Sequence, residues 1–452
     1  MTILDLAFIQ NTLALPLSNV NATVNRIVID SRDIQIGDVF VAVKGERFDG
    51  HDFVDEVLAK GALACLVSRA DCTNKPSCLK VEDTVKALGQ LAQAWRLQVN
   101  PELKVFGITG SAGKTTVKEM LATILKSAVG EQAVLATVGN FNNHIGLPLT
   151  LLQLKPQHQY AVIEMGMNHA GELAYLTDLA RPDFALVNNT LRAHIGCGFN
   201  DVEDIARAKS EIYQGLNQKG LAFLPCEDQQ MTTLQKAVTK QTKITFGLNQ
   251  GDVHAEQIIL QTSGSQFMVV TPTSKIMVEL PVPGIHMVHN AIAAAAMALS
   301  AGISTEQLAS LAHFSNVKGR LQQKRSKHGA LLIDDTYNAN PDAYIAAIDV
   351  LAAFPAPRIL VMGAIGELGI NAPELHAEVG AYARQQGIET LLCIGEYSQY
   401  AAIAYGQPQA FYTDKIQLIK ALRKYDQAEA TILIKGSRFM QMETVVSDLM
   451  TE

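Results

Sequence analysis

Residues 107–116 read Gly-Ile-Thr-Gly-Ser-Ala-Gly-Lys-Thr-Thr and decide the fold of this chain. The apolar residues from Leu103 to Ile108 predict a strand before the turn, and residues 117–125 predict a helix after it. Glycines let backbone N–H groups converge on a phosphate, and the helix N-terminus adds the positive end of its dipole. Lys114 supplies a cation for the β- and γ-phosphates, and the hydroxyl of Thr115 suits Mg²⁺. The motif therefore predicts an ATP-binding loop.

The glycine spacing differs from the usual GxxxxGK[ST] pattern, because Ile108 stands where the first glycine of that pattern would be. A glycine turn followed by Lys-Thr-Thr by chance is the plain alternative, and the strand–loop–helix context argues against it. We expect the phosphates to be held by Gly110, Ser111, Ala112, Gly113, Lys114, Thr115 and Thr116.

The composition excludes several classes of protein. The chain has 452 residues, too many for one core, so we expect about two to four domains. Hydrophobic residues make up 48% and charged residues 18%, which is typical of globular proteins. The formal net charge is −7 and no basic tract occurs, which argues against a nucleic-acid partner.

Neither a membrane span nor a secretion signal is predicted. The uncharged stretch 280–304 contains prolines and histidines before an alanine-rich run, so it predicts a buried helix. Asp5 and the lack of a cationic segment near the N-terminus argue against a signal peptide. The six cysteines form no CxxC pair, and Cys72 and Cys78 are expected in a polar loop. We therefore expect reduced thiols and a cytoplasmic location.

Three blocks follow one another along the chain, and we expect one domain from each: 1–83, 84–313 and 314–452. In the first, strand-like runs lie at 26–29, 39–43 and 64–67, around a helix at 53–61. In the second, a helix at 84–97 precedes the phosphate loop, and strands at 160–164, 184–188 and 222–224 alternate with helices. The third restarts the alternation, with strands at 330–334, 358–362, 390–394 and 431–434.

This alternation predicts an α/β protein with largely parallel sheets and helices on both faces. Residues 253–282 are rich in strand-forming residues without helices, and they predict a small antiparallel layer beside the central sheet. Two α/β blocks and a smaller N-terminal one favour a site at the domain junctions.

Polar residues near predicted strand ends indicate a metal site beside the phosphate loop. Glu164 ends an apolar strand, where its carboxylate would hold Mg²⁺ together with Thr115. A surface glutamate is the plain alternative. His194 follows another strand and would be a second ligand, although a lone histidine is more often structural. Lys209, on a helix predicted over 202–213, is a solvated lysine when taken alone.

Charged and amide side chains of the third block also lie near predicted strand ends or turns. They are Arg320, Asp335, Asn338, Lys435 and Arg438. Each is weak evidence by itself. Together they are suited to a ribose, a triphosphate and an anionic acyl group, and they predict a phosphate site shared by two domains.

Four motifs in this order carry a family resemblance. They are Thr-Gly-Ser-Ala-Gly-Lys-Thr-Thr (109–116), Gly-Asn-Phe-Asn-Asn-His-Ile-Gly-Leu-Pro (139–148), Glu-Met-Gly-Met-Asn-His (164–169) and Asp-Asp-Thr-Tyr-Asn-Ala-Asn-Pro (334–341). The set resembles the Mur ligases, nearly from end to end. Asp30-Ser31-Arg32 and Lys44-Gly45-Glu46-Arg47-Phe48-Asp49-Gly50-His51 resemble the uridine-nucleotide-binding part of that family.

The resemblance implies a UDP-sugar-binding N-terminal domain, a central ATPase domain and a C-terminal Rossmann-like domain. Within the family, the motifs are most similar to the members that add D-alanyl-D-alanine to a UDP-N-acetylmuramoyl-tripeptide. The implied activity is an ATP-dependent amide ligase of peptidoglycan synthesis that needs Mg²⁺, and we expect a monomer.

The resemblance also assigns roles residue by residue. Thr115, Glu164, His194 and a carbamylated Lys209, fifteen residues after the histidine, would hold two Mg²⁺. Asn290, Arg320, Asp335 and Asn338 would contact the nucleotide. Lys114, Asn143, His194 and Lys209 would serve catalysis, with Asn143 near the acyl phosphate. The substrates would contact Ser31, Arg32, Lys44, Gly45, Arg47, Phe48, Asp49, His51, Asn338, Asn340, Lys435, Ser437 and Arg438.

Three positions depart from the family pattern. Met287 stands where an asparagine near adenine is expected, and Ala364 replaces an aspartate in the motif at 363–369. His194 is followed by Ile-Gly-Cys, where an acidic residue is common.

Other functions stay open at this point. One is a sister ligase that adds a single amino acid, or a folylpolyglutamate synthase. The Asp-Asn-Pro-Arg motif of the ligase for a diamino acid does not occur, since residues 340–343 read Asn-Pro-Asp-Ala. Another is a regulatory P-loop ATPase that ligates nothing, and the uridine-site motifs argue against it.

Overall fold

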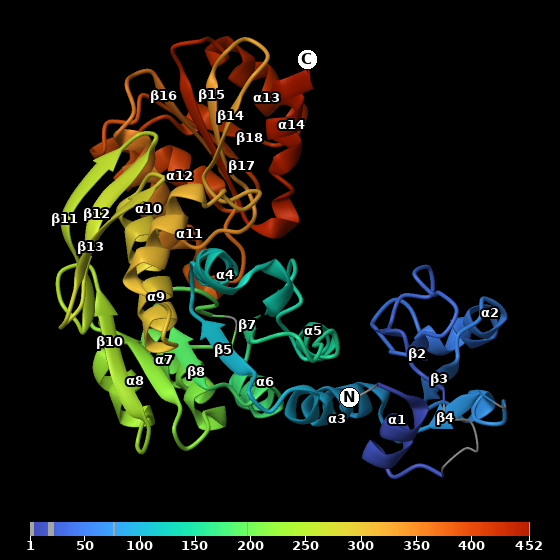
Figure 1. Cartoon of the computed structure of the whole chain (residues 1–452). Coiled ribbons are helices and arrows are strands. Elements are labelled where there is room, and N and C mark those ends of the chain that lie inside the picture. The colour runs from blue at the N-terminus through green and yellow to red at the C-terminus, as the bar shows by residue number, and fades with distance from the viewer. Residues whose placement is uncertain (1–3, 17–21, 76, 197, 452) are drawn as a thin grey trace.

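The computed structural model describes residues 4–16, 22–75, 77–196 and 198–451, which form three α/β domains in chain order (Figure 1). Each domain is built around its own sheet, so the predicted α/β class is confirmed. Within the described residues, no helix combines the length and the apolar character needed to cross a membrane.

The N-terminal domain holds a small parallel sheet in the order β1-β2-β3-β4. Its elements are α1 (Leu6–Thr12), β1 (Ile27–Val28), β2 (Val39–Val41), α2 (Val54–Ala59), β3 (Ala64–Val67) and β4 (Cys78–Lys80). The prediction missed α1 and β4. Cys78 is therefore on an edge strand and not in a polar loop, because it pairs with Cys65 of β3.

The central domain holds a nine-stranded sheet in the order β13-β12-β11-β10-β9-β8-β5-β7-β6. Its strands are β5 (Lys104–Thr109), β6 (Val134–Ala136), β7 (Tyr160–Glu164), β8 (Phe184–Val187), β9 (Leu221–Pro225), β10 (Thr242–Gly247), β11 (Val253–Gln261), β12 (Gly264–Val270) and β13 (Lys275–Leu280). Its helices are α3 (Thr84–Val99), α4 (Lys114–Val129), α5 (Gly146–Leu151), α6 (Glu172–Ala180), α7 (Val202–Ser210), α8 (Met231–Ala237) and α9 (Ile285–Ser300).

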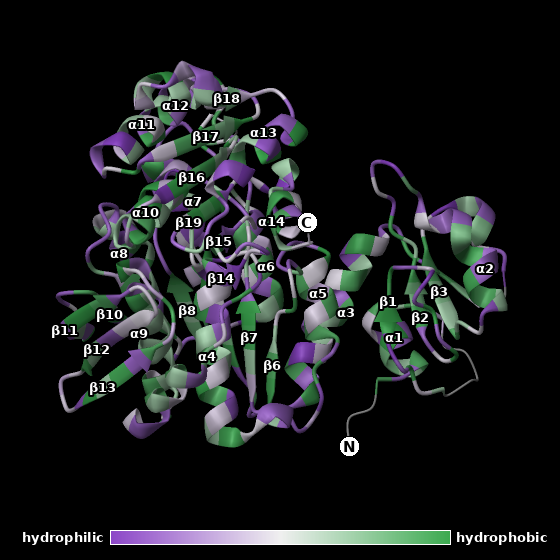
Figure 2. Cartoon of the chain, turned by 90° about the horizontal axis from the view of Figure 1, so that it is seen from above, coloured by the Kyte–Doolittle hydropathy of each residue, from purple (hydrophilic) through white to green (hydrophobic). Residues whose placement is uncertain are grey.

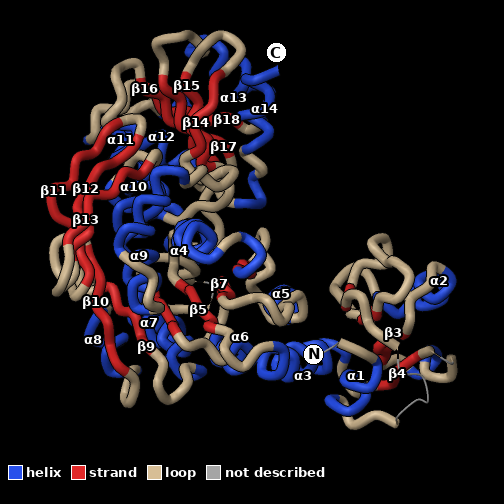
Figure 3. The backbone as a smooth tube through the Cα atoms, in the orientation of Figure 1, coloured by secondary structure: helices blue, strands red, loops and turns tan. Residues whose placement is uncertain are grey.

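The predicted separate antiparallel layer is wrong in one respect. The strands β11, β12 and β13 are antiparallel to one another, but β11 pairs in parallel with β10, so they continue the central sheet (Figure 3). The reason is that the backbone at Phe246–Gly247 pairs directly with Val253–His254, which leaves no break at which a second layer could start.

The C-terminal domain holds a six-stranded sheet in the order β14-β15-β19-β16-β17-β18, parallel except for β14. Its strands are β14 (Gln322–Arg325), β15 (Leu331–Asp335), β16 (Arg358–Gly363), β17 (Thr390–Ile394), β18 (Phe411–Tyr412) and β19 (Thr431–Lys435). Its helices are α10 (Pro341–Ala352), α11 (Ala372–Gln385), α12 (Ser398–Tyr405), α13 (Lys415–Leu422) and α14 (Glu443–Thr451).

The central sheet is buried on both faces, as the near-continuous apolar runs of its strands require. Along β5, Phe106 and Ile108 pack with α4 and α9, whereas Val105 packs with α3 and α6. Figure 2 shows that β6, β7 and β8 are mostly hydrophobic. Because β5 lies between β7 and β8, its carboxyl end is where the strand order reverses, and ligands bind at such a point.

Helix α3 joins the N-terminal domain to the central one (Figure 1). Asp83 caps it by accepting hydrogen bonds from the N–H groups of Val85 and Lys86. Leu88 and Leu91 then belong to one buried cluster with Ile9 of α1 and residues of the central sheet. The N-terminal domain is thus held mainly through this helix, away from the C-terminal domain.

Candidate active site

The phosphate loop joins β5 to α4, as predicted. Gly113 caps α4 with φ +79°, and a Cβ there would lie 2.4 Å from Oδ1 of Asn290. Only glycine combines this left-handed backbone with so close a neighbour. Gly110 is also in a backbone conformation that L side chains rarely adopt. The glycines at 110 and 113 are therefore required by the geometry of the loop.

Lys114 is held against the loop, where its Nζ donates to the carbonyl of Gly110 at 2.8 Å. Burial lowers the pKa of the ammonium, and the nearby Glu164 carboxylate opposes that effect. A bound phosphate would favour the charged form.

Thr115 and Glu164 meet as predicted. The Thr115 hydroxyl donates to Oε2 of Glu164 at 2.7 Å, and Nδ2 of Asn142 donates to Oε1 at 2.7 Å. Arg320, from the segment that leads into the C-terminal domain, donates to the Thr115 hydroxyl at 3.0 Å. Glu164 is only 2% exposed and forms no ion pair with any described residue. Its carboxylate is therefore available to a cation.

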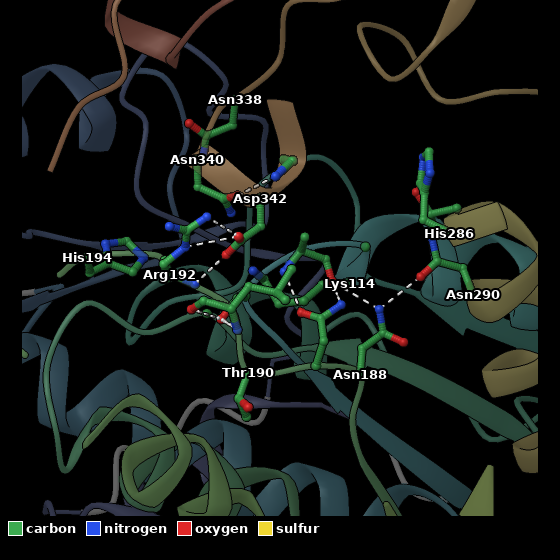
Figure 4. A pocket seen from close by; sticks show the side chains of 18 of the residues that line it. Lys114, Asn188, Thr190, Arg192, His194, His286, Asn290, Asn338, Asn340 and Asp342 are labelled. Carbon is green, nitrogen blue, oxygen red and sulfur yellow. Dashed lines mark hydrogen bonds and ion pairs between the residues drawn. The ribbon is translucent and has the colours of Figure 1, made fainter. Parts of the chain in front are cut away.

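The segment after β8 holds the phosphate loop through hydrogen bonds. Asn189 accepts from the N–H of Ala112 at 2.9 Å, and Ser111 Oγ donates to the carbonyl of Leu191 at 3.0 Å. Asn188 donates to Oδ1 of Asn290 at 2.8 Å (Figure 4). These contacts fix the loop before any ligand binds. The pair Asn188-Asn189 was missed, although two amides directly after a buried strand are the kind of signal that identified Glu164.

A cavity of about 1360 Å³ lies between the central and C-terminal domains (Figure 4). The predicted site residues that line it are Ser111, Ala112, Gly113, Lys114, Thr116, Asn143, Glu164, His194, Asn290, Arg320, Asp335, Asn338, Asn340 and Lys435. Three of its side chains carry buried polar atoms without a hydrogen-bond partner among the described residues: Arg320 Nε, Asn188 Oδ1 and His286 Nδ1. A polar ligand would satisfy them.

The C-terminal wall of the cavity is organised around Asp335 at the end of β15. Lys435, at the end of the adjacent β19, donates to Oδ2 of Asp335 at 2.6 Å and to the carbonyl of Asn338 at 3.0 Å. Asn340 caps α10 by accepting from the N–H of Ala343. The guanidinium of Arg320 lies 4.3 Å from the centroid of the Tyr337 ring. Cations and amides are therefore held in place around one side of the cavity.

His194 and Lys209 occupy different environments. His194 has φ +63°, and its Nδ1 lies 2.7 Å from Oε2 of Glu367, which holds the pKa of that carboxyl below its usual value. Lys209 is 2% exposed, and its Nζ donates to no described residue. It is therefore not the solvated lysine that its helix position indicates. Burial, and next the charge of Lys114, lower the pKa of Lys209 well below its usual value.

Among the described residues, no group of three His, Cys, Asp or Glu side chains is arranged to hold a metal ion. The donors that fit Mg²⁺ best are the hydroxyl of Thr115 and the carboxylate of Glu164, which are hard oxygen ligands side by side.

The predicted uridine-site residues do not reach this cavity, because they belong to the N-terminal domain. Lys44, Gly45, Arg47 and Phe48 are exposed on one loop, and Phe48 is 76% exposed. Arg32 is exposed and pairs with Asp30, whereas Ser31 is half-buried.

His51 is built into the N-terminal fold. Its Nδ1 lies 2.6 Å from Oδ1 of Asp49, and its Nε2 accepts from the N–H of Ser68 at 2.9 Å. Both ring nitrogens are thus already used within the domain, which fits a residue that shapes the exposed loop better than one that contacts a substrate.

Two further predicted residues are placed outside the cavity. Ser437 is buried and accepts from the N–H of Gly366 at 2.9 Å. Arg438 is exposed and pairs with Glu443. The expected clustering of Arg438 with Arg320, Asp335 and Lys435 is therefore wrong, because Arg438 lies in a short helix after β19 and pairs with α14.

Arg192 joins the two walls of the cavity and was missed. It forms an ion pair with Asp342 of α10 at 2.6 Å (Figure 4). A second ion pair joins it to Glu378 of α11 at 2.7 Å. Gly196 also packs against the backbone of Leu368 and Gly369. No local motif marks this arginine, since its partners are far away in the sequence.

Three family models match this chain in order. The description "Mur ligase family, catalytic domain" covers residues 23–96, "Mur ligase middle domain" covers 108–298, and "Mur ligase, glutamate ligase domain" covers 319–438. A protein of Escherichia coli (strain K12), named UDP-N-acetylmuramoyl-tripeptide–D-alanyl-D-alanine ligase, is 42% identical over 96% of this chain and 95% of its own. This chain is a Mur ligase.

Solved structures support the same family assignment. A crystal structure of MurF from Acinetobacter baumannii is 36% identical, covers 100% of both chains and has a TM-score of 0.92. A structure of MurF ligase from Thermotoga maritima in complex with ADP is 30% identical, covers 94% of this Mur ligase and 97% of that chain, and has a TM-score of 0.83. The expected three-domain fold is confirmed.

The departures from the family pattern have visible consequences in this Mur ligase. Met287 is buried at the cavity wall, with its Sδ 3.8 Å from Nδ2 of Asn290. A thioether thus takes the place of an amide beside the phosphate loop. Ala364 is buried, and its carbonyl accepts from the N–H of Ser437 at 3.1 Å.

Proposed function

We propose that this Mur ligase joins D-alanyl-D-alanine to a UDP-N-acetylmuramoyl-tripeptide, with conversion of ATP to ADP and phosphate, in peptidoglycan precursor synthesis. The observation that carries the proposal is the match over almost the whole chain to a protein named for this reaction. The shared cavity supports it, because phosphate-binding groups from two domains line one volume. The ADP complex of a related MurF supports ATP as the nucleotide.

A carboxylate is a poor electrophile, so amide formation requires activation. We propose that the γ-phosphoryl group of ATP passes to the terminal carboxylate of the tripeptide and forms an acyl phosphate. The amine of D-alanyl-D-alanine then attacks the acyl carbon, the carbon–oxygen bond to phosphate breaks, and the amine proton is released. The backbone N–H groups at the start of α4 would bind the phosphates, and Lys114 would offset charge on the transferring group.

Mg²⁺ is the metal that the donor set at Thr115 and Glu164 favours, and it would supply charge neutralisation during phosphoryl transfer. Glu164 would hold the ion through a carboxylate that Asn142 orients. We further propose a second Mg²⁺ held by His194 and Lys209.

Carbamylation of Lys209 is part of this proposal. Only a neutral amine attacks CO₂, and burial favours the neutral form of this lysine. The nitrogen forms a bond to the carbon of CO₂ as one C=O double bond opens to C–O⁻, one proton leaves the nitrogen, and a buried neutral amine becomes a carboxylate-like ligand. The same burial that would make an ammonium costly makes the carbamate chemistry accessible.

Asn143 is proposed to lie near the acyl phosphate. Its Oδ1 accepts from the N–H of Gly146 at 2.9 Å, which begins α5 and leaves the side-chain amide N–H groups free to donate. Asn290, Arg320, Asp335 and Asn338 are proposed to contact the nucleotide, and Asn340 and Lys435 the acyl group.

The N-terminal domain is proposed to bind the uridine diphosphate of the donor. Its exposed loop offers the cations Lys44 and Arg47 together with the exposed ring of Phe48, and Ser31 and Arg32 offer further donors. We propose domains over 1–83, 84–313 and 314–452, a monomer, and a cytoplasmic location where these nucleotides occur. The free state of the five described cysteines is consistent with that location.

A phosphate-release assay with defined substrates tests this function. Release should depend on the UDP-N-acetylmuramoyl-tripeptide and D-alanyl-D-alanine together. A sister ligase would respond to a single amino acid in place of the dipeptide, a folylpolyglutamate synthase to a folate and glutamate, and a regulatory ATPase to neither substrate. Phosphate release at the same rate with and without D-alanyl-D-alanine would reject the proposal.

A further inference from the structure

Lys118 is a buried cation that the proposed chemistry does not use. It lies on α4, one turn beyond the phosphate loop, and its side chain is only 1% exposed. Its Nζ donates to the carbonyl of Thr137 at 2.6 Å and pairs with the partly exposed Glu119. It does not line the cavity, and its Nζ is held by the groups named above.

The contact with Thr137 leads directly to Glu164. Thr137 is buried just after the edge strand β6, and its hydroxyl accepts from the N–H of Glu164 at 3.0 Å. Its own N–H donates to the carbonyl of Val162 in β7. Lys118 therefore ties α4, the end of β6 and the end of β7 together beneath the carboxylate.

The segment that begins at Thr137 carries further site residues. We define it as the 137–143 loop. Asn142 donates to Glu164 at 2.7 Å, and its carbonyl accepts from the N–H of Gly166 at 2.8 Å. The side chain of Asn143 accepts from the N–H of Gly146, the first residue of α5. The position of this loop thus decides where the carboxylate and two cavity-lining amides lie.

We propose that Lys118 is a positioning residue, which anchors the 137–143 loop so that Thr137 and Asn142 hold the Glu164 carboxylate beside the hydroxyl of Thr115. The inference rests on the proposed function in that Glu164 is taken as a Mg²⁺ ligand. Burial of an ammonium costs several kcal/mol unless it is paired and hydrogen-bonded. A plain apolar helix face would avoid this cost, so the lysine needs a role that an apolar side chain cannot fill.

Lys118→Met tests the anchor, because it keeps the length of the side chain and removes the donor. Lys126→Met is the matched control, since it removes a cation from the last turn of the same helix. Thr137→Val removes the hydroxyl that accepts from Glu164 with little change of shape, and it decides the matter if Lys118→Met does not fold. The measurements are calorimetric titration of ATP with varied Mg²⁺ or with a chelator, and hydrogen exchange of the 137–143 loop.

We expect both test variants to weaken Mg²⁺ binding in the presence of ATP by about tenfold or more, the usual size of an effect on the groups that orient a metal ligand. ATP affinity in the chelator should change less than twofold, exchange of the 137–143 loop should quicken, and Lys126→Met should match the wild type. Unchanged Mg²⁺ affinity in folded test variants, or equal losses with and without Mg²⁺, would overturn the proposal.

These readouts require no peptide substrate. Failure of the wild type to ligate D-alanyl-D-alanine would reject the proposed function and leave the anchor role intact. If the ATP affinity of the wild type does not depend on Mg²⁺, the anchor role is overturned and the identity of the substrates stays open.

Discussion

Three charged side chains of the site have little contact with water. Lys209 and Glu164 are buried and Lys114 is half-buried at the cavity wall, and burial lowers the pKa of both lysine ammonium groups. Under the proposed function each group would take a different partner: a phosphate for Lys114, a divalent cation for Glu164 and CO₂ for Lys209. A phosphate and a divalent cation would each bring a charge opposite to that of the residue they meet, whereas CO₂ would react with the neutral amine of Lys209.

Lys114→Ala should lower the rate of ligation by a factor on the order of 10³ or more, because the transferring phosphoryl group loses its fixed cation. The fold should survive, since the side chain donates only to the carbonyl of Gly110. Steady-state kinetics together with circular dichroism check this. Near-normal turnover in a folded variant would contradict the ATP-site assignment.

Lys209→Ala should be nearly inactive and should recover partly with acetate or formate, which would fill the vacant ligand position. An unmodified cation predicts rescue by amines instead, and a lysine without a role predicts nearly full activity. Activity measured against increasing formate distinguishes these cases. Mass spectrometry of the native protein gives a second test, since absence of the added CO₂ mass in the metal-bound protein would count against carbamylation.

The sequence predicts some residues of the candidate site and misses others. Glycines 110 and 113 and Lys114 were predicted because the backbone geometry of a phosphate loop dictates their types. The burial of Lys209 was not, because its own helix gives no sign of what packs on it. Arg192 was missed for the same reason: its partners, Asp342 and Glu378, meet it only after two domains have folded.

Among the elements, the connections after the central strands determine the site. The segment after β8 hydrogen-bonds to the phosphate loop at its start and contacts the C-terminal domain further on, through Arg192 and His194. In the C-terminal domain, the opposing segment 364–371 is held by His376 of α11. The Nε2 of His376 accepts from the N–H of Ile365 at 3.0 Å, and its Nδ1 lies 2.6 Å from the carbonyl of Ala372.

His376 should make the stability of the C-terminal domain sensitive to acid. Burial lowers its pKa, and a protonated ring would lose the acceptor for Ile365. As the pH falls through about 6.5, His376 binds a proton in the unfolded chain but not in the folded one. The free energy of unfolding therefore falls until the pH reaches the lower pKa of the folded state. His376→Gln should be less stable than the wild type at pH 7.5 by about 1–3 kcal/mol and less sensitive to acid.

Thermal unfolding at pH 7.5 and pH 5.5 checks this prediction. The exposed His328, in the same domain, provides the matched control as His328→Gln. An acid-induced fall in Tm that is equal in His376→Gln and the wild type would contradict it.

Elements with long apolar runs were predicted well, and short or polar ones were not. The strand β7 lies at the predicted residues 160–164, because four consecutive buried positions after Tyr160 leave few alternatives. The strands β4, β14 and β18 were missed because they are short edge strands with partly exposed residues. The joining of β10 to β11 depends on pairing between backbones, which periodicity does not report.

At the scale of the whole molecule, the ATP-site wall and the C-terminal wall of the cavity belong to different domains. Arg192 and His194 bridge them through carboxylates of α10, α11 and the segment 364–371. The exposed loop with Lys44, Arg47 and Phe48, which is proposed to bind the uridine diphosphate, lies on a third domain. That domain is attached mainly through α3 (Figure 1). Under the proposed function, we expect the domains to come together around the reactants and exclude water from the acyl phosphate.

Arg192→Ala should shift the central and C-terminal domains toward an open arrangement and lower kcat/KM about tenfold, since two half-buried ion pairs are worth about 1–1.5 kcal/mol together. Small-angle scattering with ATP present should give a larger radius of gyration for this variant. Arg181→Ala removes an exposed pair within the central domain and serves as the control. Equal scattering curves and equal kinetics for both variants would refute the bridging role.

The proposed reaction of this Mur ligase is activation of a peptide carboxylate by phosphorylation, followed by its joining to D-alanyl-D-alanine. Its most direct test uses UDP-N-acetylmuramoyl-tripeptide labelled with ¹⁸O in the terminal carboxylate, with Mg²⁺, ATP and the dipeptide. Mass spectrometry should find one pentapeptide product for each phosphate formed, and each phosphate should carry one ¹⁸O from the donor. Phosphate without ¹⁸O, or its release without formation of the pentapeptide, would contradict the account.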